Sequence, residues 1–527
     1  MKLLSAALLF LSLLVSALSQ STSSSAADAD LSSFVGCLIN ASSSYSSLVA
    51  FSSKFFYTRS DANFSSVLGS YIRNLQFATP TTPKPLAVVT PLAPNHVQAT
   101  ILCARNNSLQ IRIRSGGHDY EGLSYISHVP FIILDLFNLR DIKIDLKTET
   151  ALVQAGATLG ELYYAISQQS NVHAFPAGVC FTIGAGDHFT GGGYGNLMRK
   201  FGLSVDYIVD ATIVDVNGRI LDRKGMGEDL FWAIRGGGAA SFGVVLGYKI
   251  NLVRVPEIVT VFKVPKTLEE GATDVVEQWQ QLVADDSLDK ELFIRIMPVA
   301  TNSTVTVYFI GMFLGDSAAL LRAVSTKFPL LGLTKEDVVE TSWVKSTMFW
   351  YDVPLNTSTD FLLRRAPSGS SYLKRKSDYV QSPIPRLGLE AVWKKMIQLG
   401  GNVSMQFNPY GGRMAEISPS ETPFPHRAGN LWLIQYSSNW KDAADGETRL
   451  DAINQLYDLM TPYVSKSPRE AFLNYRDIDI GTNAHGQADF GYKYFKANFD
   501  RLIRIKAAVD PDNFFQYEQS IPTKSVV

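Results

Sequence analysis

The sequence predicts an α+β fold, because two parts of the chain differ in pattern. In the first part, an apolar strand-like run at 86–90 precedes helical spacing at 95–104 and a second strand-like run at 110–114. Strand, helix and strand in this order are typical of an α/β layer. In the second part, 257–470, the pattern changes to that of an antiparallel sheet with covering helices.

The remaining elements follow from the same patterns. Residues 36–80 have polar-faced helical spacing, and the tail at 494–509 is helical until Asp510-Pro511 should stop it. Lys374-Arg375-Lys376 is interpreted as a solvated surface patch. Further β runs occupy 131–136, 151–154, 207–215, 248–253, 305–309 and 431–436, and further helical runs occupy 268–283 and 316–327.

Composition excludes two classes of protein. The chain has 527 residues, of which 46% are apolar, and 48 Lys+Arg against 49 Asp+Glu give a net charge of -1. Disorder requires low hydrophobicity and high net charge, and binding to nucleic acid requires a surplus of basic residues. We therefore expect a large folded protein of two or three domains with no nucleic-acid partner.

The N-terminus is typical of a secretory signal peptide, residues 1–19. Lys2 is followed by an apolar run to Leu18, and small residues stand at Ala17 and Ser19, where cleavage is expected. The alternative, a transmembrane anchor, is disfavoured because the run is shorter than the about 20 residues of a span. We expect no membrane association, and secretion to the apoplast or delivery to the vacuole. Six glycosylation sequons agree with this route, at Asn40, Asn63, Asn106, Asn302, Asn356 and Asn402.

The chain has three cysteines, which allow one disulfide and leave one thiol over. An oxidising compartment would let Cys37 pair with Cys103. Cys180 is then the odd thiol, and the simplest interpretation of it is a buried structural cysteine.

Three glycine-dense segments lie close together in the sequence, at 114–122, 178–195 and 235–243. Glycines let backbone N–H groups wrap an anion, because no Cβ blocks access and positive φ costs little. One such loop is usually a turn, whereas three in one α/β region favour a cradle for a large cofactor that carries phosphate.

Several common sites are absent from the sequence. The third glycine of the dinucleotide fingerprint is replaced by Ser241, and there is no P-loop, His-Glu-x-x-His or Gly-x-Ser-x-Gly motif. The seven histidines show no metal-ligand spacing, so no metal is expected.

Two nucleophiles stand inside the glycine loops, His118 in the first and Cys180 in the second. Neutral imidazole and thiolate could each bond to a flavin ring, which is electrophilic at its 8α-methyl and at C6. This hypothesis explains the odd cysteine, the histidine and the glycines together. Its rival is a noncovalent site with a core histidine and an inert cysteine.

Together with further segments, these glycine loops make the sequence resemble the plant berberine bridge enzyme-like flavoproteins, which have the vanillyl-alcohol-oxidase-type fold. The resemblance covers nearly the whole mature chain, from Cys37 to Pro522. Seven segments carry it in order, at 114–122, 176–180, 191–195, 236–243, 423–429, 474–477 and 510–522.

The resemblance implies FAD bonded to His118 and Cys180, and a Cys37–Cys103 disulfide. It implies a two-part FAD-binding domain, 78–256 and 471–527, around a substrate-binding domain at 257–470, after an N-terminal segment at 20–77. The cofactor would take hydride at flavin N5, and oxygen would then accept the electrons as hydrogen peroxide.

Site residues are carried over onto matching positions. Tyr475 is expected to serve as the base, which needs a nearby cation such as Arg295 because a tyrosine has a pKa of about 10. The alternative is a neutral Tyr475 that only donates a hydrogen bond. Gln435 is a further catalytic candidate, and Tyr410 is a weaker candidate for the pocket. The expected cofactor-binding residues are His118, Cys180, Arg114, Ser115, Gly116, Gly117, Tyr120, Gly184, Gly186, His188, Gly191, Gly192, Gly193, Tyr194, Gly243 and Asn513.

The sequence departs from the family pattern at several positions. Phe181 stands where proline is usual, and Asp187 replaces a glycine beside the cofactor loop. Leu433 stands where some relatives carry a polar side chain, and the loop 481–491 is short. Ile183 matches a position associated with oxygen access, which does not decide the acceptor.

Three functions are compatible with these observations. The first is a secreted oxidase, expected to be a monomer, that removes hydride from a plant phenolic or another specialised metabolite. The second is a flavin-containing cyclase of the Diels-Alder type, which would join an aromatic diene and dienophile without net redox change. The third is a storage or defence protein that keeps the cofactor.

Overall fold

Three larger β-sheets organise the chain, and the computed structural model describes residues 30–41, 55–365, 369–483 and 488–524. The fold is α+β, as predicted. The expected signal peptide lies outside the described residues. None of the described helices combines the length and the apolarity that crossing a bilayer requires.

The first sheet has the strand order β1-β2-β4-β3. Strands β2 and β3 run parallel to β4, and α3 connects β2 to β3, which confirms the predicted strand–helix–strand unit. Pro94 opens α3, where a missing N–H costs nothing. The bounds are β1 Phe56–Thr58, β2 Ala87–Val89, α3 Pro94–Asn106, β3 Gln110–Arg114 and β4 Phe131–Asp135.

The second sheet is antiparallel, in the order β5-β6-β10-β8-β9. Its strands are β5 Ile142–Asp145, β6 Thr150–Gln154, β8 Ile208–Val214, β9 Ile220–Leu221 and β10 Val244–Asn251. The helices associated with it are α4 Leu159–Ser167, α5 Ala185–Thr190, α6 Met198–Phe201 and α7 Arg223–Ala233, and β7 His173–Ala174 pairs separately with β11 Val253–Arg254.

The third sheet is the predicted antiparallel sheet, with seven strands in the order β15-β12-β14-β13-β17-β18-β16. Its strands are β12 Val259–Thr267, β13 Leu292–Ala300, β14 Val305–Phe313, β15 Val338–Thr341, β16 Tyr372–Val380, β17 Ser404–Pro409 and β18 Trp432–Trp440. The helices of this part are α8 Ala272–Ala284, α9 Ser317–Lys327, α10 Trp343–Phe349, α11 Arg386–Gln398, α12 Arg413–Glu416 and α13 Gly446–Leu459.

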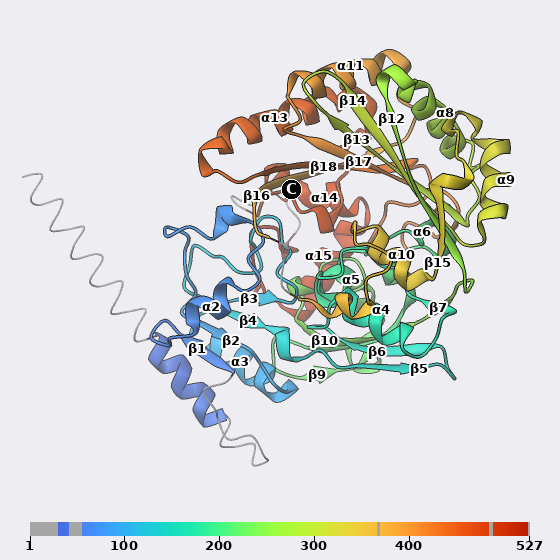
Figure 1. Ribbon diagram of the computed structural model, residues 1–527. Coiled ribbons are helices and arrows are strands. Elements are labelled where there is room, and N and C mark those ends of the chain that lie inside the picture. Colours follow the sequence, from blue (N-terminus) through green and yellow to red (C-terminus); the bar gives the residue numbers. More distant parts are fainter. Residues whose placement is uncertain (1–29, 42–54, 366–368, 484–487, 525–527) are drawn as a thin grey trace, which may run out of the picture.

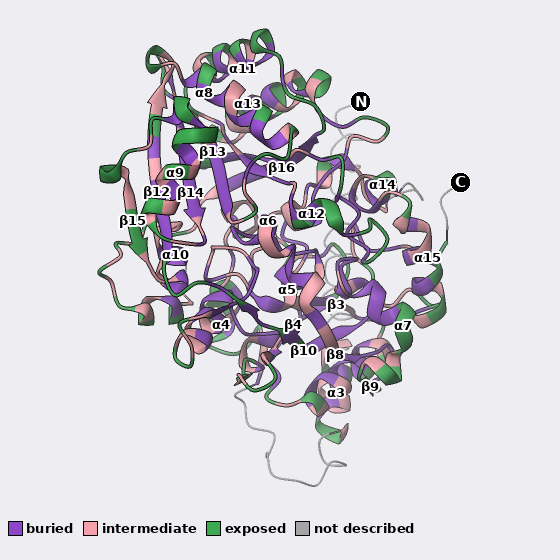
Figure 2. Ribbon diagram, turned by 90° about the vertical axis from the view of Figure 1, so that its right-hand side faces the viewer, coloured by how far each residue is buried: buried purple, intermediate pink, exposed green. Residues whose placement is uncertain are grey.

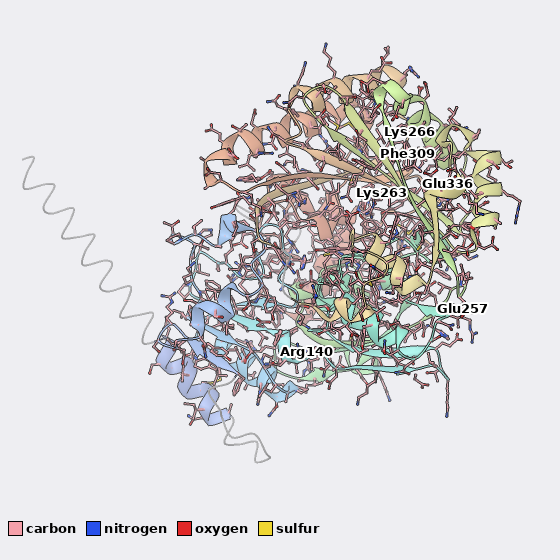
Figure 3. The ribbon with its side chains drawn as sticks, viewed as in Figure 1. Arg140, Glu257, Lys263, Lys266, Phe309 and Glu336 are labelled. Atoms are coloured by element: carbon pink, nitrogen blue, oxygen red, sulfur yellow. A yellow bond between two sulfur atoms is a disulfide. The ribbon has the colours of Figure 1, made fainter. Side chains whose placement is uncertain are left out.

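One face of the large sheet is covered by helices, because α8, α11 and α13 lie over it (Figure 1). The outward sides of these helices are exposed while the strands beneath are mostly buried (Figure 2). Phe309 of β14, labelled in Figure 3, is fully buried in this core. The opposite face of the sheet is directed toward the rest of the molecule, where α14 and α15 lie (Figure 1).

The tail prediction is confirmed in its main part, because α15 Asn498–Val509 ends directly before Asp510-Pro511. The helical run is interrupted after α14 Asp489–Phe495, where Lys496 has a φ of 49°. The prediction that 36–80 is helical was wrong for most of the described part. A helix covers 30–41, but the described residues that follow form β1 and only a short helix, α2 Phe64–Gly69. Pairing with β2 overrides the local helical spacing there.

Cys37 and Cys103 form a disulfide between the helix at 30–41 and α3, across a sequence separation of 66 residues. Cys180 is a free thiol.

Candidate active site

A cavity of about 370 Å³ lies where the glycine-rich loops, the large sheet and the C-terminal segment meet. Residues far apart in the sequence therefore share one wall. Of the residues proposed from the sequence, eight line this cavity: His118, Tyr120, Cys180, His188, Tyr194, Arg295, Gln435 and Tyr475.

His118 and Cys180 lie side by side on this wall. His118 Nε2 is 3.0 Å from Thr182 Oγ1, and Cys180 Sγ is 3.6 Å from the same oxygen. Burial, with Arg73 and His188 nearby, holds the pKa of His118 well below its usual value. The imidazole is therefore neutral, which is its nucleophilic form.

Three tyrosines also line this cavity. The hydroxyls of Tyr194 and Tyr475 share a hydrogen bond, and the ring of Tyr120 lies 6.3 Å from that of Tyr475. Gln435 Nε2 donates to the Tyr120 hydroxyl at 3.3 Å. Burial, together with the two neighbouring tyrosines, raises the pKa of Tyr475 well above its usual value, although Arg295 opposes this.

Arg295 lies on β13 next to the tyrosine pair. Its Nε donates to Asn408 Oδ1 at 2.6 Å, and its guanidinium lies 5.1 Å from the ring centre of Trp350. Burial raises the pKa of Tyr194, and Arg295 opposes that rise. The cation expected near the tyrosines is thus present, but Tyr475 is still a neutral phenol in this structure.

Asp187 and His188 of α5 also line the cavity. Asp187 Oδ2 accepts a hydrogen bond from the Gly116 N–H at 3.1 Å, and burial raises the pKa of Asp187 to about 7. His188 Nε2 accepts from the Gly178 N–H at 3.0 Å, and burial lowers the pKa of His188 to about 3. The departure at Asp187 therefore places a carboxyl group on the first glycine loop.

None of the proposed cofactor-binding glycines is among the residues that line this cavity. A Cβ on Gly116 or Gly184 would collide with the other residue's backbone, and a Cβ on Gly191 would meet the Asn474 side chain. Gly193 has a φ of 73°, which favours glycine. These glycines allow the loops to pack closely. A Cβ at these positions would be directed at neighbouring segments and not at the cavity.

Three other proposed residues also lie outside this first cavity. Arg114 is fully buried and pairs with Asp135 at 2.7 Å, and Ser115 Oγ donates to the Ala155 carbonyl at 2.6 Å, so both hold the first glycine loop in place. Asn513, with a φ of 53°, lines a second cavity.

The two cavities adjoin, because Arg112, Gln516 and Tyr517 line both. Three buried oxygens at the second cavity, Asn483 Oδ1, Asn513 Oδ1 and Glu518 Oε2, have no hydrogen-bond partner among the described residues. Such unpaired buried atoms are rare in native proteins and are consistent with a polar ligand.

The basic triplet was wrongly interpreted as a solvated patch. Lys374 and Lys376 on β16 are 5% and 3% exposed, and they pair with Glu121, Asp477 and Asp479. Arg375 points to the other face of the strand, with its guanidinium 5.4 Å from the ring centre of Tyr120. Arg112 and Arg476 also line the cavity but were not proposed as site residues, although Arg476 lies in the segment 474–477 that carries the resemblance.

Comparisons with known proteins identify the class. A model described as "FAD binding domain" matches residues 85–223, and one described as "Berberine and berberine like" matches 471–522. Berberine bridge enzyme-like 14 of Arabidopsis thaliana is 54% identical over 479 residues, which is 89% of this chain and 90% of that protein.

Two solved structures show the same fold. BBE-like 28 of Arabidopsis thaliana has a TM-score of 0.87 at 42% identity, and so has Phl p 4, a grass pollen allergen with glucose dehydrogenase activity. Each comparison covers 93% of this chain and 99% of the other. The chain therefore belongs to the berberine bridge enzyme-like family, and it is an FAD-linked oxidoreductase of that type.

The residues present fit FAD. The adjoining cavities provide an elongated site with unpaired polar atoms in the second cavity, while the tyrosines line the first. His118 and Cys180 both contact the Thr182 hydroxyl, so the two side chains lie close together at this site.

Proposed function

We propose that this protein is a secreted oxidase that removes hydride from a plant phenolic or a related specialised metabolite, with oxygen as the acceptor. The observation that carries the proposal is the wall on which neutral His118 and free Cys180 face one cavity with three tyrosines. When bound there, FAD supplies the hydride acceptor and, after reoxidation by oxygen, yields hydrogen peroxide.

The cofactor would be attached at both nucleophiles. His118, as neutral imidazole, would bond to the 8α carbon and Cys180, as thiolate, to C6 of the flavin. Each new bond would replace a C–H bond, with the proton released and the two electrons passed through the flavin to oxygen. Acid-precipitated protein should then remain yellow, and only the His118→Ala, Cys180→Ala double variant should release its flavin. Release from the wild-type protein would show that both bonds are wrong.

The tyrosine pair would move the substrate proton. If Tyr194 has first lost its proton, which the neighbouring Arg295 favours and burial opposes, Tyr475 could take the proton of a substrate hydroxyl while it passes its own proton to Tyr194. Tyr475→Phe should lower kcat by about a hundredfold to ten-thousandfold, as loss of a general acid or base does. A wild-type rate in Tyr475→Phe would exclude this role.

An aromatic substrate suits the apolar surfaces of the cavity. Trp350, Tyr351 and Phe472 line it together with the tyrosines, and aromatic rings pack well on such groups. The glucose dehydrogenase activity named for Phl p 4 makes a sugar the competing substrate class. A metabolite screen that follows flavin reduction and peroxide together would distinguish phenolics from sugars, and oxygen from other acceptors.

A cyclase is the second candidate, and the neutral state of Tyr475 favours it. A phenol that keeps its proton can hold a polar substrate group by a hydrogen bond without taking a proton away. Anaerobic mixing with substrate separates the two functions. An oxidase must bleach the visible flavin band, whereas a cyclase must form product while the band stays oxidised.

Passage through the secretory pathway is supported by the Cys37–Cys103 disulfide, since disulfides persist in oxidising compartments. The sequon asparagines are exposed, except for Asn402, which is partly buried, so glycosylation is sterically possible at most of them. We expect the mature protein to be a monomeric glycoprotein in the apoplast or the vacuole.

A further inference from the structure

Two charged links flank the tyrosines of the site. Tyr120 stands between Asp119 and Glu121 in the sequence, and Tyr475 stands directly before Arg476 and Asp477. Arg476 Nε is 3.1 Å from Asp119 Oδ2, which joins the two tyrosine-bearing segments directly.

The second link passes through the large sheet. Lys374 Nζ on β16 lies 2.6 Å from Glu121 Oε1 and 2.8 Å from Asp477 Oδ1. All three side chains are more than nine-tenths buried. One ammonium group therefore holds the loop of Tyr120 and the segment of Tyr475 at a set distance from each other.

The neighbouring residue on β16 contacts the same loop from the opposite face. Because side chains alternate along a strand, Arg375 points away from Lys374 and lies over the ring of Tyr120. The hydrogen bonds of Arg375 to the Lys374 and Ser438 carbonyls, both at 2.9 Å, hold its guanidinium in place. Strand β16 thus holds the Tyr120 loop through two of its side chains.

The cluster around Lys374 holds more acids than bases. Lys374 and Lys376 face the carboxyl groups of Glu121, Asp477 and Asp479. Burial first, and then Asp477 and Asp479, raise the pKa of Glu121 to about 7, against the pull of Lys374. Although burial of its ammonium opposes the charge, Asp477 and Glu121 raise the pKa of Lys374, which stays protonated. The ionisable groups that face Glu121 are Lys374, Asp477, Asp479, Tyr125 and Tyr494.

We propose that Lys374 is a positioning residue that, through Glu121 and Asp477, sets the distance between Tyr120 and Tyr475, and that protonation of Glu121 relaxes this setting. With Glu121 neutral, Lys374 is held by Asp477 and Asp479 alone, and the Tyr120 loop loses one of its two charged links. The inference deepens the proposed function, because these tyrosines line the cavity where the substrate would lie.

The test follows the tyrosines themselves and needs no turnover. Full-length protein is labelled with tyrosine that carries an NMR-active carbon isotope at Cζ, and the two signals are assigned with Tyr120→Phe and Tyr475→Phe. In the wild type, both signals should shift as the pH passes through about 7, the pKa of Glu121. In Glu121→Gln, this shift should disappear while both signals remain sharp.

Lys374→Met should displace both signals at every pH, and Lys374→Arg, which keeps the charge, should restore them in part. Arg386→Met removes an exposed cation on α11 and should change neither signal. If Lys374→Met fails to fold, Glu121→Gln decides the question alone. A pH-dependent shift that persists in Glu121→Gln, or tyrosine signals unmoved in folded Lys374→Met, would overturn the proposal. Because no substrate is used, either result is independent of whether the protein is an oxidase.

Discussion

Two charged clusters in this protein have similar distances but different surroundings. On the outer helical layer, Arg386 of α11 pairs with Asp274, Glu277 and Glu390 at 2.5–3.2 Å, and all four side chains are at least one third exposed. On β16, the Lys374 cluster has N···O distances of 2.6–3.1 Å, and four of its five side chains are buried. Distance alone therefore does not distinguish the two clusters, whereas burial does.

The comparison shows what burial changes physically. An exposed ion pair is screened by water and salt, and its net contribution to stability is about 0–1 kcal/mol. A buried pair has lost its hydration, so removal of one partner leaves an uncompensated charge. The exposed cluster lies on the covering helices α8 and α11 (Figure 1), whereas the buried one includes Glu121, which directly follows Tyr120 of the cavity in the sequence.

The largest expected effect is that of Lys374→Met. It removes the only cation paired with Glu121 among the described residues and leaves Asp477 and Asp479 with Lys376 alone, so the free energy of unfolding should fall by about 3–5 kcal/mol. Denaturant unfolding above pH 7, where Glu121 is ionised, measures this change. A loss below about 1 kcal/mol, as is typical of exposed pairs, would remove the distinction between the two clusters.

A smaller effect is expected for Glu121→Gln, and it depends on pH. The unfolded chain releases the proton of Glu121 near pH 4.5, whereas the folded protein keeps it until about pH 7. Since the folded state binds more protons in this window, the contribution of Glu121 to stability falls as the pH rises through it. Glutamine does not titrate, so the thermal stability of Glu121→Gln should not show this part of the decline as the pH rises. An unchanged pH profile would contradict the assignment.

The smallest effect is expected for Arg386→Met. Its partners remain hydrated, so the free energy of unfolding should change little. Added salt should reduce even this difference, because exposed charges are screened over about 10 Å at 0.1 M. Unfolding at low and high salt provides the measurement, and a large, salt-independent loss would show that this cluster behaves like the buried one.

The sequence predicted the parts of the site that depend on neighbours along the chain. Apolar runs identified strands such as β3, β4 and β14, because a strand buried on one or both faces must present apolar side chains. His118 and Cys180 were proposed together because each stands inside a glycine loop. In the structure, both side chains contact the Thr182 hydroxyl. Their covalent role remains a prediction.

Where partners lie far along the chain, local pattern was insufficient. Lys374-Arg375-Lys376 has the composition of a surface patch. The carboxyl groups that pair with its two lysines, however, belong to residues about 100 or more positions away. The same limit applies to the glycines, whose Cβ positions meet other segments that the sequence does not identify. Arg112 lies in a predicted strand and Arg476 in the segment 474–477, but the sequence does not show that their side chains line a cavity.

By itself, the sequence determined the fold class, the family resemblance and the two nucleophiles, because these depend on side-chain chemistry and on spacing along the chain. Only the tertiary structure decided which charges are buried and how the tyrosines meet. Burial and electrostatic coupling depend on distances through space, and β16 brings Glu121 within 2.6 Å of Lys374 across a separation of 253 residues.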